Sequence, residues 1–121
     1  MTLSKKKYRY IGIYLSGRLS SNKYAILDEL SGRYLGLFGS IDYSKANIRI
    51  IKINNIPNTI VILKCRLESL TNTLISLGLV ELELMVVSIS GTLKQLKKRI
   101  IDFLNYVSEN QKGLTFNFKD S

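Results

Sequence analysis

Hydrophobic and polar residues alternate along four stretches of the chain, and this pattern predicts four β-strands. In the first, residues 8–15 (YRYIGIYL), Ile11, Ile13 and Leu15 fall on one face and the tyrosines on the other. A period of two in segments rich in β-branched and aromatic residues is typical of strands with a buried face. The other three predicted strands are residues 47–54 (NIRIIKIN), 59–67 (TIVILKCRL) and 79–90 (LVELELMVVSIS).

Apolar residues at helical spacing predict a first helix after residue 20. Ser20 or Ser21 can cap its N-terminus, and Gly39 is expected to end it. Residues 40–46 (SIDYSKA) are then expected to form a connecting loop.

Two more helices follow the same spacing. The second covers residues 66–78 (RLESLTNTLISLG), and the third runs from about Thr92 to Val107. The last residues, 112–121 (KGLTFNFKDS), alternate again, so we expect them to add a strand or to lie against a neighbour.

The order of these elements is strand, helix, strand, strand, helix, strand, helix. It matches the split βαβ, ferredoxin-like α+β sandwich, with a four-stranded antiparallel sheet and an extra C-terminal helix. A chain of 121 residues fits one domain, residues 1–121, with a basic N-terminal segment (1–7) and a C-terminal tail (about 109–121).

The sheet face turned away from the first two helices is too apolar to be fully exposed to water. It is predicted to hold Tyr10, Tyr14, Ile60, Ile62, Met85 and Val87. The third helix, a protein partner or RNA bases would cover part of it, and self-association as a homodimer would also bury it.

A glycine turn joins the last strand to the third helix in residues 88–99 (SISGTLKQLKKR). Gly91 permits a tight turn after Ser90, and Thr92 can cap the helix. Amide groups at a helix start can bind an anion.

Four cations follow this turn. On a helical wheel Lys94 and Lys98 share one flank, Lys97 borders it, and Arg99 falls on the other side. Such an arrangement suits a phosphate backbone. The alternative is a capped surface helix whose lysines are simply solvated.

The N-terminal stretch KKKYRY interleaves cations with aromatic rings. Lys6, Lys7 and Arg9 stand beside Tyr8 and Tyr10, a combination found on platforms that bind single-stranded RNA. Because the third strand contains no RNP1-like string, backbone contacts are favoured over base stacking. A solubilising terminus with packed strand tyrosines is the alternative.

The charge balance points to a polyanionic partner. The chain carries 18 Lys and Arg against 9 Asp and Glu, a net charge of +9. Nucleic acid is the first candidate for such a partner, and an anionic membrane surface is its rival.

Catalytic chemistry has few candidates in this chain. Histidine is absent, so nucleophile–histidine pairs and His-based zinc sites are excluded. Cys65 stands alone, which excludes an internal disulfide and favours a reducing, cytoplasmic location; the residue is expected to be a small buried hydrophobe. Glu81 and Glu83 share a predicted strand face and could hold Mg²⁺, but a polar edge, or pairing with basic residues, is the favoured explanation.

Three stretches together carry a family resemblance: KKKYRYIGI, ILKCRLESLTNTLISLG and VSISGTLKQLKKR, in that order. They resemble the archaeal ribonuclease P protein component 2 family from about Lys5 to Arg99. The Ser90–Gly91–Thr92 turn followed by a basic helix is the most specific of them.

The resemblance implies a non-catalytic subunit of a ribozyme that removes the 5′ leader of precursor tRNA. The RNA would carry the Mg²⁺-dependent chemistry, the chain itself would bind no cofactor, and its partners would be the RNA, precursor tRNA, ribonuclease P protein component 3 and other subunits. The residues expected to contact RNA are Lys6, Lys7, Arg9, Ser90, Gly91, Thr92, Lys94, Lys97, Lys98 and Arg99.

Two other hypotheses stay open at this point. One is a regulatory module that binds a small anion in a pocket between sheet and helices, since ferredoxin-like folds host many functions. The other is a metal-dependent nuclease that uses Glu81 and Glu83.

Overall fold

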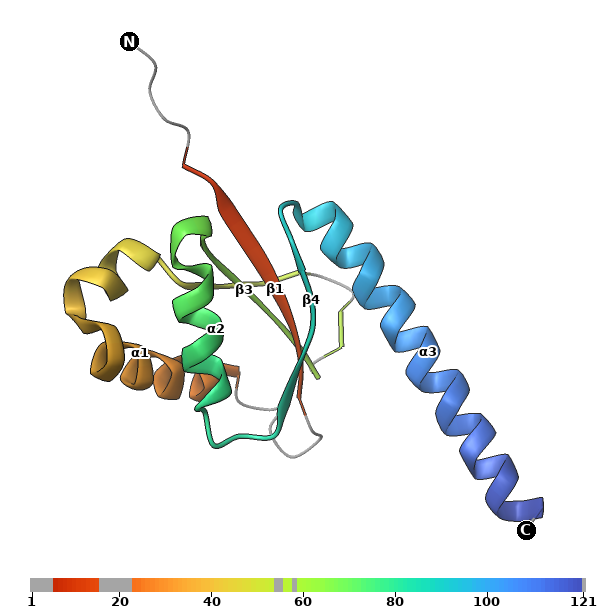
Figure 1. Ribbon diagram of the computed structural model, residues 1–121. Helices are drawn as coiled ribbons and strands as arrows, with labels where there is room; N and C mark the ends of the chain where they lie inside the picture. The colour runs from red at the N-terminus through yellow and green to blue at the C-terminus, as the bar shows by residue number, and fades with distance from the viewer. Residues whose placement is uncertain (1–5, 16–22, 54–55, 58, 121) are drawn as a thin grey trace.

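The computed structural model describes residues 6–15, 23–53, 56–57 and 59–120. The predicted caps Ser20 and Ser21 lie outside these residues. The elements are β1 (Tyr8–Leu15), α1 (Lys23–Ala46), β2 (Arg49–Ile51), β3 (Ile60–Arg66), the 3-10 turn η1 (Leu67–Ser69), α2 (Leu70–Gly78), β4 (Leu84–Ser90) and α3 (Leu93–Asp120) (Figure 1).

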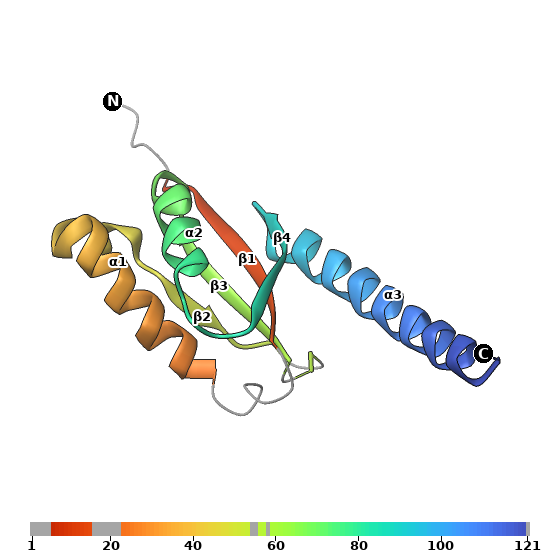
Figure 2. The same cartoon turned by 60° about the horizontal axis from the view of Figure 1, so that its bottom comes forward.

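The four strands form one antiparallel sheet in the order β2-β3-β1-β4. Helices α1 and α2 cover one face and α3 lies on the other (Figures 1 and 2). The predicted ferredoxin-like α+β fold with an extra C-terminal helix is therefore confirmed.

The first core fills the space between the sheet and helices α1 and α2. Ile11, Ile13 and Leu15 of β1 are fully buried there, together with Ile26 and Leu30 of α1. The alternation predicted for β1 is confirmed, because its tyrosines lie on the opposite face.

The second core lies under α3. Leu96 and Ile100 of the helix are fully buried against Ile60 and Ile62 of β3, and Tyr10 and Tyr14 pack around them. Of the covers that the sequence allowed for this face, the third helix is the one observed. Met85, at the far end of the face, remains half exposed.

The loop predicted for residues 40–46 is wrong. Gly39 does interrupt the helical geometry, with φ 88° and ψ 168°, but helix resumes and continues to Ala46. The ring of Tyr43 packs edge-on against buried Tyr34, and its hydroxyl shares a 2.6 Å hydrogen bond with Ser31. These contacts fold the second piece of α1 back onto the first.

Three further boundaries differ from prediction. The tail adds no strand, because α3 continues as helix to Asp120. β2 is only three residues long, and β4 begins at Leu84, so Glu81 and Glu83 precede the strand.

A register shift also changes the faces of β4. Ile13 pairs with Val86 but Gly12 pairs with Ser88, which leaves Val87 as an extra residue between them. Such a bulge reverses the alternation beyond it. Ile89 consequently packs against the first core.

Candidate nucleic-acid interface

The turn between β4 and α3 is held by a network of side chains. The hydroxyl of Ser90, only 5% exposed, donates to Gln95 Oε1 (3.1 Å) and accepts the amide hydrogen of Thr92 (3.2 Å). Thr92 Oγ1 accepts the amide of Gln95 at 3.3 Å, as expected of an N-cap. The backbone amides of Thr92 and Gln95, at the predicted anion site, are therefore already hydrogen-bonded within the turn. The cationic side chains nearby are the stronger candidates for binding an anion.

Arg9 of β1 reaches this turn from a neighbouring strand. A Cβ added at Gly91 would lie 3.3 Å from Arg9 Nη1 and 3.5 Å from its Cζ. The absence of a side chain at Gly91 thus leaves room for the guanidinium, which also donates to the carbonyl of Tyr8 at 2.8 Å. The structure brings together Arg9 and the turn, which lie about 80 residues apart in the chain.

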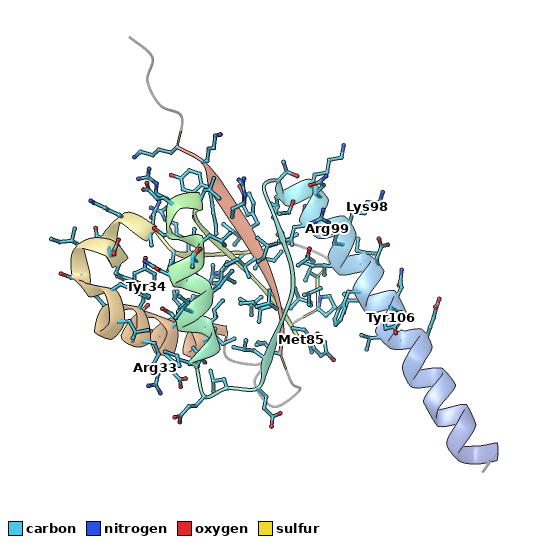
Figure 3. All side chains as sticks on the ribbon, in the orientation of Figure 1. Arg33, Tyr34, Met85, Lys98, Arg99 and Tyr106 are labelled. Carbon is cyan, nitrogen blue, oxygen red and sulfur yellow. The ribbon has the colours of Figure 1, made fainter. Side chains whose placement is uncertain are left out.

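The three lysines of α3 lie on its solvent side. Lys94, Lys97 and Lys98 are exposed, and Figure 3 shows Lys98 on the side of the helix that faces away from the sheet. They line an open groove of about 500 Å³ together with Leu93, Ile101 and Asp102. Within the described part of the chain none of these lysines forms an ion pair, so their charges face water.

Arg99 is separated from these lysines. Its Nη1 donates to Ser88 Oγ (3.3 Å) and to the carbonyl of Ile89 (3.0 Å), both on β4 (Figure 3). Arg99 therefore ties α3 to the sheet edge, a role that the helical wheel did not predict.

The remaining predicted cations precede β1. Lys6 and Lys7 are exposed, and the carbonyl of Lys7 accepts the amide of Leu67 at 2.8 Å. This bond fixes the start of β1 beside the end of β3.

Three cations that were not predicted lie at the same end of the sheet: Arg49, Lys64 and Arg66. In an antiparallel sheet the starts of β1 and β2 meet the ends of β3 and β4, so this end spans all four strands, about 14 Å at ordinary strand spacing. We call this region the cationic end of the sheet; its residues are Lys6, Lys7, Arg9, Arg49, Lys64 and Arg66.

Three carboxylates, Glu29, Glu81 and Glu83, lie near the other end of the sheet. Glu29 of α1 accepts the backbone amide of Glu81, and Arg33 forms a 3.5 Å ion pair with Glu81. Glu81 and Glu83, the two acids considered as a Mg²⁺ pair, thus precede β4. Glu81 contacts Glu29 and Arg33 of α1. No group of three or more potential metal ligands occurs among the residues that the structure describes.

Cys65 occupies the first core, as predicted, and is fully buried. Burial raises the pKa of the thiol, and a hydrogen bond with Thr73 opposes this in part. A buried, protonated thiol is a poor nucleophile.

The fold and the surface define a ferredoxin-like α+β protein with a polycationic end. No helix in the described ranges is long and apolar enough to cross a membrane.

Comparison with known families identifies the chain more closely. The model of the Rpp14/Pop5 family matches residues 7–101, from the start of β1 into α3. The chain belongs to this family of ribonuclease P protein subunits. No curated protein matches it significantly.

Family membership confirms the resemblance to a ribonuclease P protein component. It makes the chain a subunit of a ribonucleoprotein complex that contains RNA and other subunits. The match covers Arg9, the Ser90–Gly91–Thr92 turn and the lysines of α3.

Proposed function

We propose that this subunit binds the RNA of ribonuclease P through its phosphates and supports that RNA in removing the 5′ leader of precursor tRNA. The chain contributes positive charge and shape. The RNA supplies the Mg²⁺-dependent chemistry.

The observation that carries this proposal is the separation of charge along the sheet. Cations from β1, β2 and β3 gather at one end and the α3 lysines stand beside it, while Glu29 and Glu81 lie toward the other. Arg66 is paired with Glu68 at this end, while the other cations there form no ion pair among the described residues. Such cations attract a polyphosphate and release its counterions on binding.

The proposed protein partner, ribonuclease P protein component 3, has a different surface available. With α3 over the second face of the sheet, α1 is the element whose exposed apolar side chains a protein partner could contact. Leu35, Leu37 and Ile41 are 42%, 50% and 74% exposed on this helix. Exposed apolar side chains suit a protein partner or a second copy of the chain. A cytoplasmic location fits such an assembly.

Reconstitution tests the proposed function. Cleavage of precursor tRNA by the ribonuclease P RNA is measured with and without this protein and its protein partner, at limiting Mg²⁺. We expect the protein to lower the Mg²⁺ needed for cleavage, and the variant Lys94→Gln/Lys97→Gln/Lys98→Gln to lose much of this effect. Cleavage by the protein without RNA, or cleavage indifferent to the protein, would contradict the proposal.

A further inference from the structure

Three strands place cations and tyrosines together on the α3 side of the sheet, at its cationic end. Lys64 of β3 lies directly opposite Tyr10 of β1 on one side and Arg49 of β2 on the other, and Arg66 lies opposite Tyr8. Directly opposed residues of antiparallel strands share a face. We call Arg49, Lys64 and Arg66 the sheet-floor cluster.

Helix α3 leaves this part of the face accessible. Its first residue, Leu93, packs with Tyr10 around the second core, and the sheet floor continues beyond it. Arg49 is exposed, and the side chain of Arg66 is 25% exposed. A ligand can therefore reach these cations beside the start of α3.

The sheet-floor cluster carries an electrostatic cost that the fold offsets only in part, because Arg49 donates a 3.0 Å hydrogen bond to Asn47 Oδ1 but has no carboxylate partner among the described residues. Like charges directly opposite each other destabilise a sheet, and Arg49 faces Lys64. Glu68 pairs with Arg66 at 3.1 Å, while no described carboxylate pairs with Arg49 or Lys64. Arg66 Nε is also buried without a hydrogen-bond partner in the described structure. An anionic ligand would relieve this repulsion.

The ammonium group of Lys64 is already oriented for such a ligand. It lies 4.4 Å from the ring centre of Tyr8 and 5.7 Å from that of Tyr10. Cation–π attraction holds the flexible side chain while its hydrogen-bond donors stay available. Less side-chain freedom is then lost when a phosphate binds.

The α3 lysines adjoin this floor. At 3.6 residues per turn, Lys97 lies about 160° around the helix from Arg99. Because Arg99 contacts β4, the flank that carries Lys97 faces the side away from β4, where β3 and β2 lie in the strand order. One polyanion can cross from the helix flank to the floor.

We infer that the sheet-floor cluster is a second phosphate-binding surface, which extends the RNA contact of α3 across β3 to β2. This inference rests on the proposed function, because the ligand is the same RNA. It adds Arg49, Lys64 and Arg66, none of which was predicted from sequence.

The test is the salt dependence of binding to ribonuclease P RNA by the variant Arg49→Gln/Lys64→Gln. Each phosphate contact contributes about 0.7–0.9 to the log–log slope. We expect the slope to fall by about 1.4–1.8 and the affinity at 0.1 M salt to fall about 25- to 60-fold. The thermal midpoint should change little, because the loss of the like-charge pair offsets the loss of the cation–π contacts of Lys64 and of the Arg49–Asn47 hydrogen bond. A purely structural cluster would leave RNA affinity unchanged.

A matched control removes two cations elsewhere. Arg33→Gln/Lys52→Gln lowers the net charge equally, away from the cationic end, and should keep a slope near that of the wild type. If Lys94→Gln/Lys97→Gln reduces the slope and Arg49→Gln/Lys64→Gln does not, the second surface is refuted while the α3 site stands. If the wild type binds RNA without salt dependence, the proposed function fails first. Loss of binding to phosphatidylserine vesicles, with RNA binding intact, would assign the cluster to membranes instead.

Discussion

At the scale of single residues, Gly12 determines how closely α3 approaches the sheet. A Cβ at this position would lie 3.1 Å from Ile100 Cδ1 and 3.3 Å from Leu96 Cδ1. Replacing Gly12 by Val would force the helix outward, and overpacking of this kind costs about 1–3 kcal/mol. Urea unfolding followed by circular dichroism measures the loss.

A second glycine supplies the control. Gly32 is exposed in α1 and has no neighbouring atom within 4 Å of an added Cβ. Gly32→Ala should therefore raise the free energy of unfolding by about 0.5–1 kcal/mol. Equal effects of the two substitutions would show that Gly12 does not set the helix approach.

Ionisation of Cys65 makes the free energy of unfolding depend on pH in the alkaline range. Burial raises the pKa of its thiol in the folded state, whereas an unfolded thiol ionises near pH 8.5. The neutral thiol therefore makes its full contribution to the free energy of unfolding below that pH. This contribution is lost as the pH rises toward the folded pKa, by at most about 1.4 kcal/mol per pH unit.

The variant Cys65→Ala lacks this titration. The difference in unfolding free energy between wild type and variant should therefore shrink as the pH rises above about 8.5. Chemical denaturation at several pH values measures it. A difference that stays constant across this range would contradict a raised thiol pKa.

At the scale of elements, two adjacent isoleucines show how α3 is attached. Ile100 is fully buried in the second core, and Ile101 is 54% exposed beside the lysines. Ile100→Ala should cost about 2–5 kcal/mol in unfolding free energy. Ile101→Ala should change it by no more than about 0.5 kcal/mol. Similar losses in the two variants would mean that α3 does not bury the face assigned to it.

The sequence was sufficient for the order of elements and for most faces, since alternation reports burial directly. It failed where tertiary contacts decide. Residues 40–46 look like a loop after Gly39, yet Tyr43 packs on Tyr34 and keeps them helical. The bulge at Val87 depends on how β4 pairs with β1, and alternation within one strand does not contain that information.

The same distinction applies to the candidate site: residues close together in the sequence were predicted, and residues brought together only by strand pairing were not. The turn and the α3 lysines are contiguous in sequence and were predicted together. The sheet-floor cluster comes from β2 and β3, so only the strand register brings Arg49 beside Lys64. Arg99 looked like one more helix cation, but its partners on β4 are about ten residues away in the chain.

At the scale of the whole molecule, a net charge of +9 is distributed unevenly. The exposed lysines of α3 stand next to the cationic end of the sheet, whereas Arg33 is paired with Glu81 away from it. Under the proposed function, RNA should approach this subunit at that end, and ionic strength should control its affinity.

The slope of log Kd against log salt concentration for ribonuclease P RNA tests this most directly, with wild type compared with Lys94→Gln/Lys97→Gln/Lys98→Gln. Loss of three phosphate contacts should lower the slope by about 2–3, while Arg33→Gln/Lys52→Gln should leave it nearly unchanged. A triple variant that keeps the wild-type slope would remove α3 from the RNA interface and contradict the account.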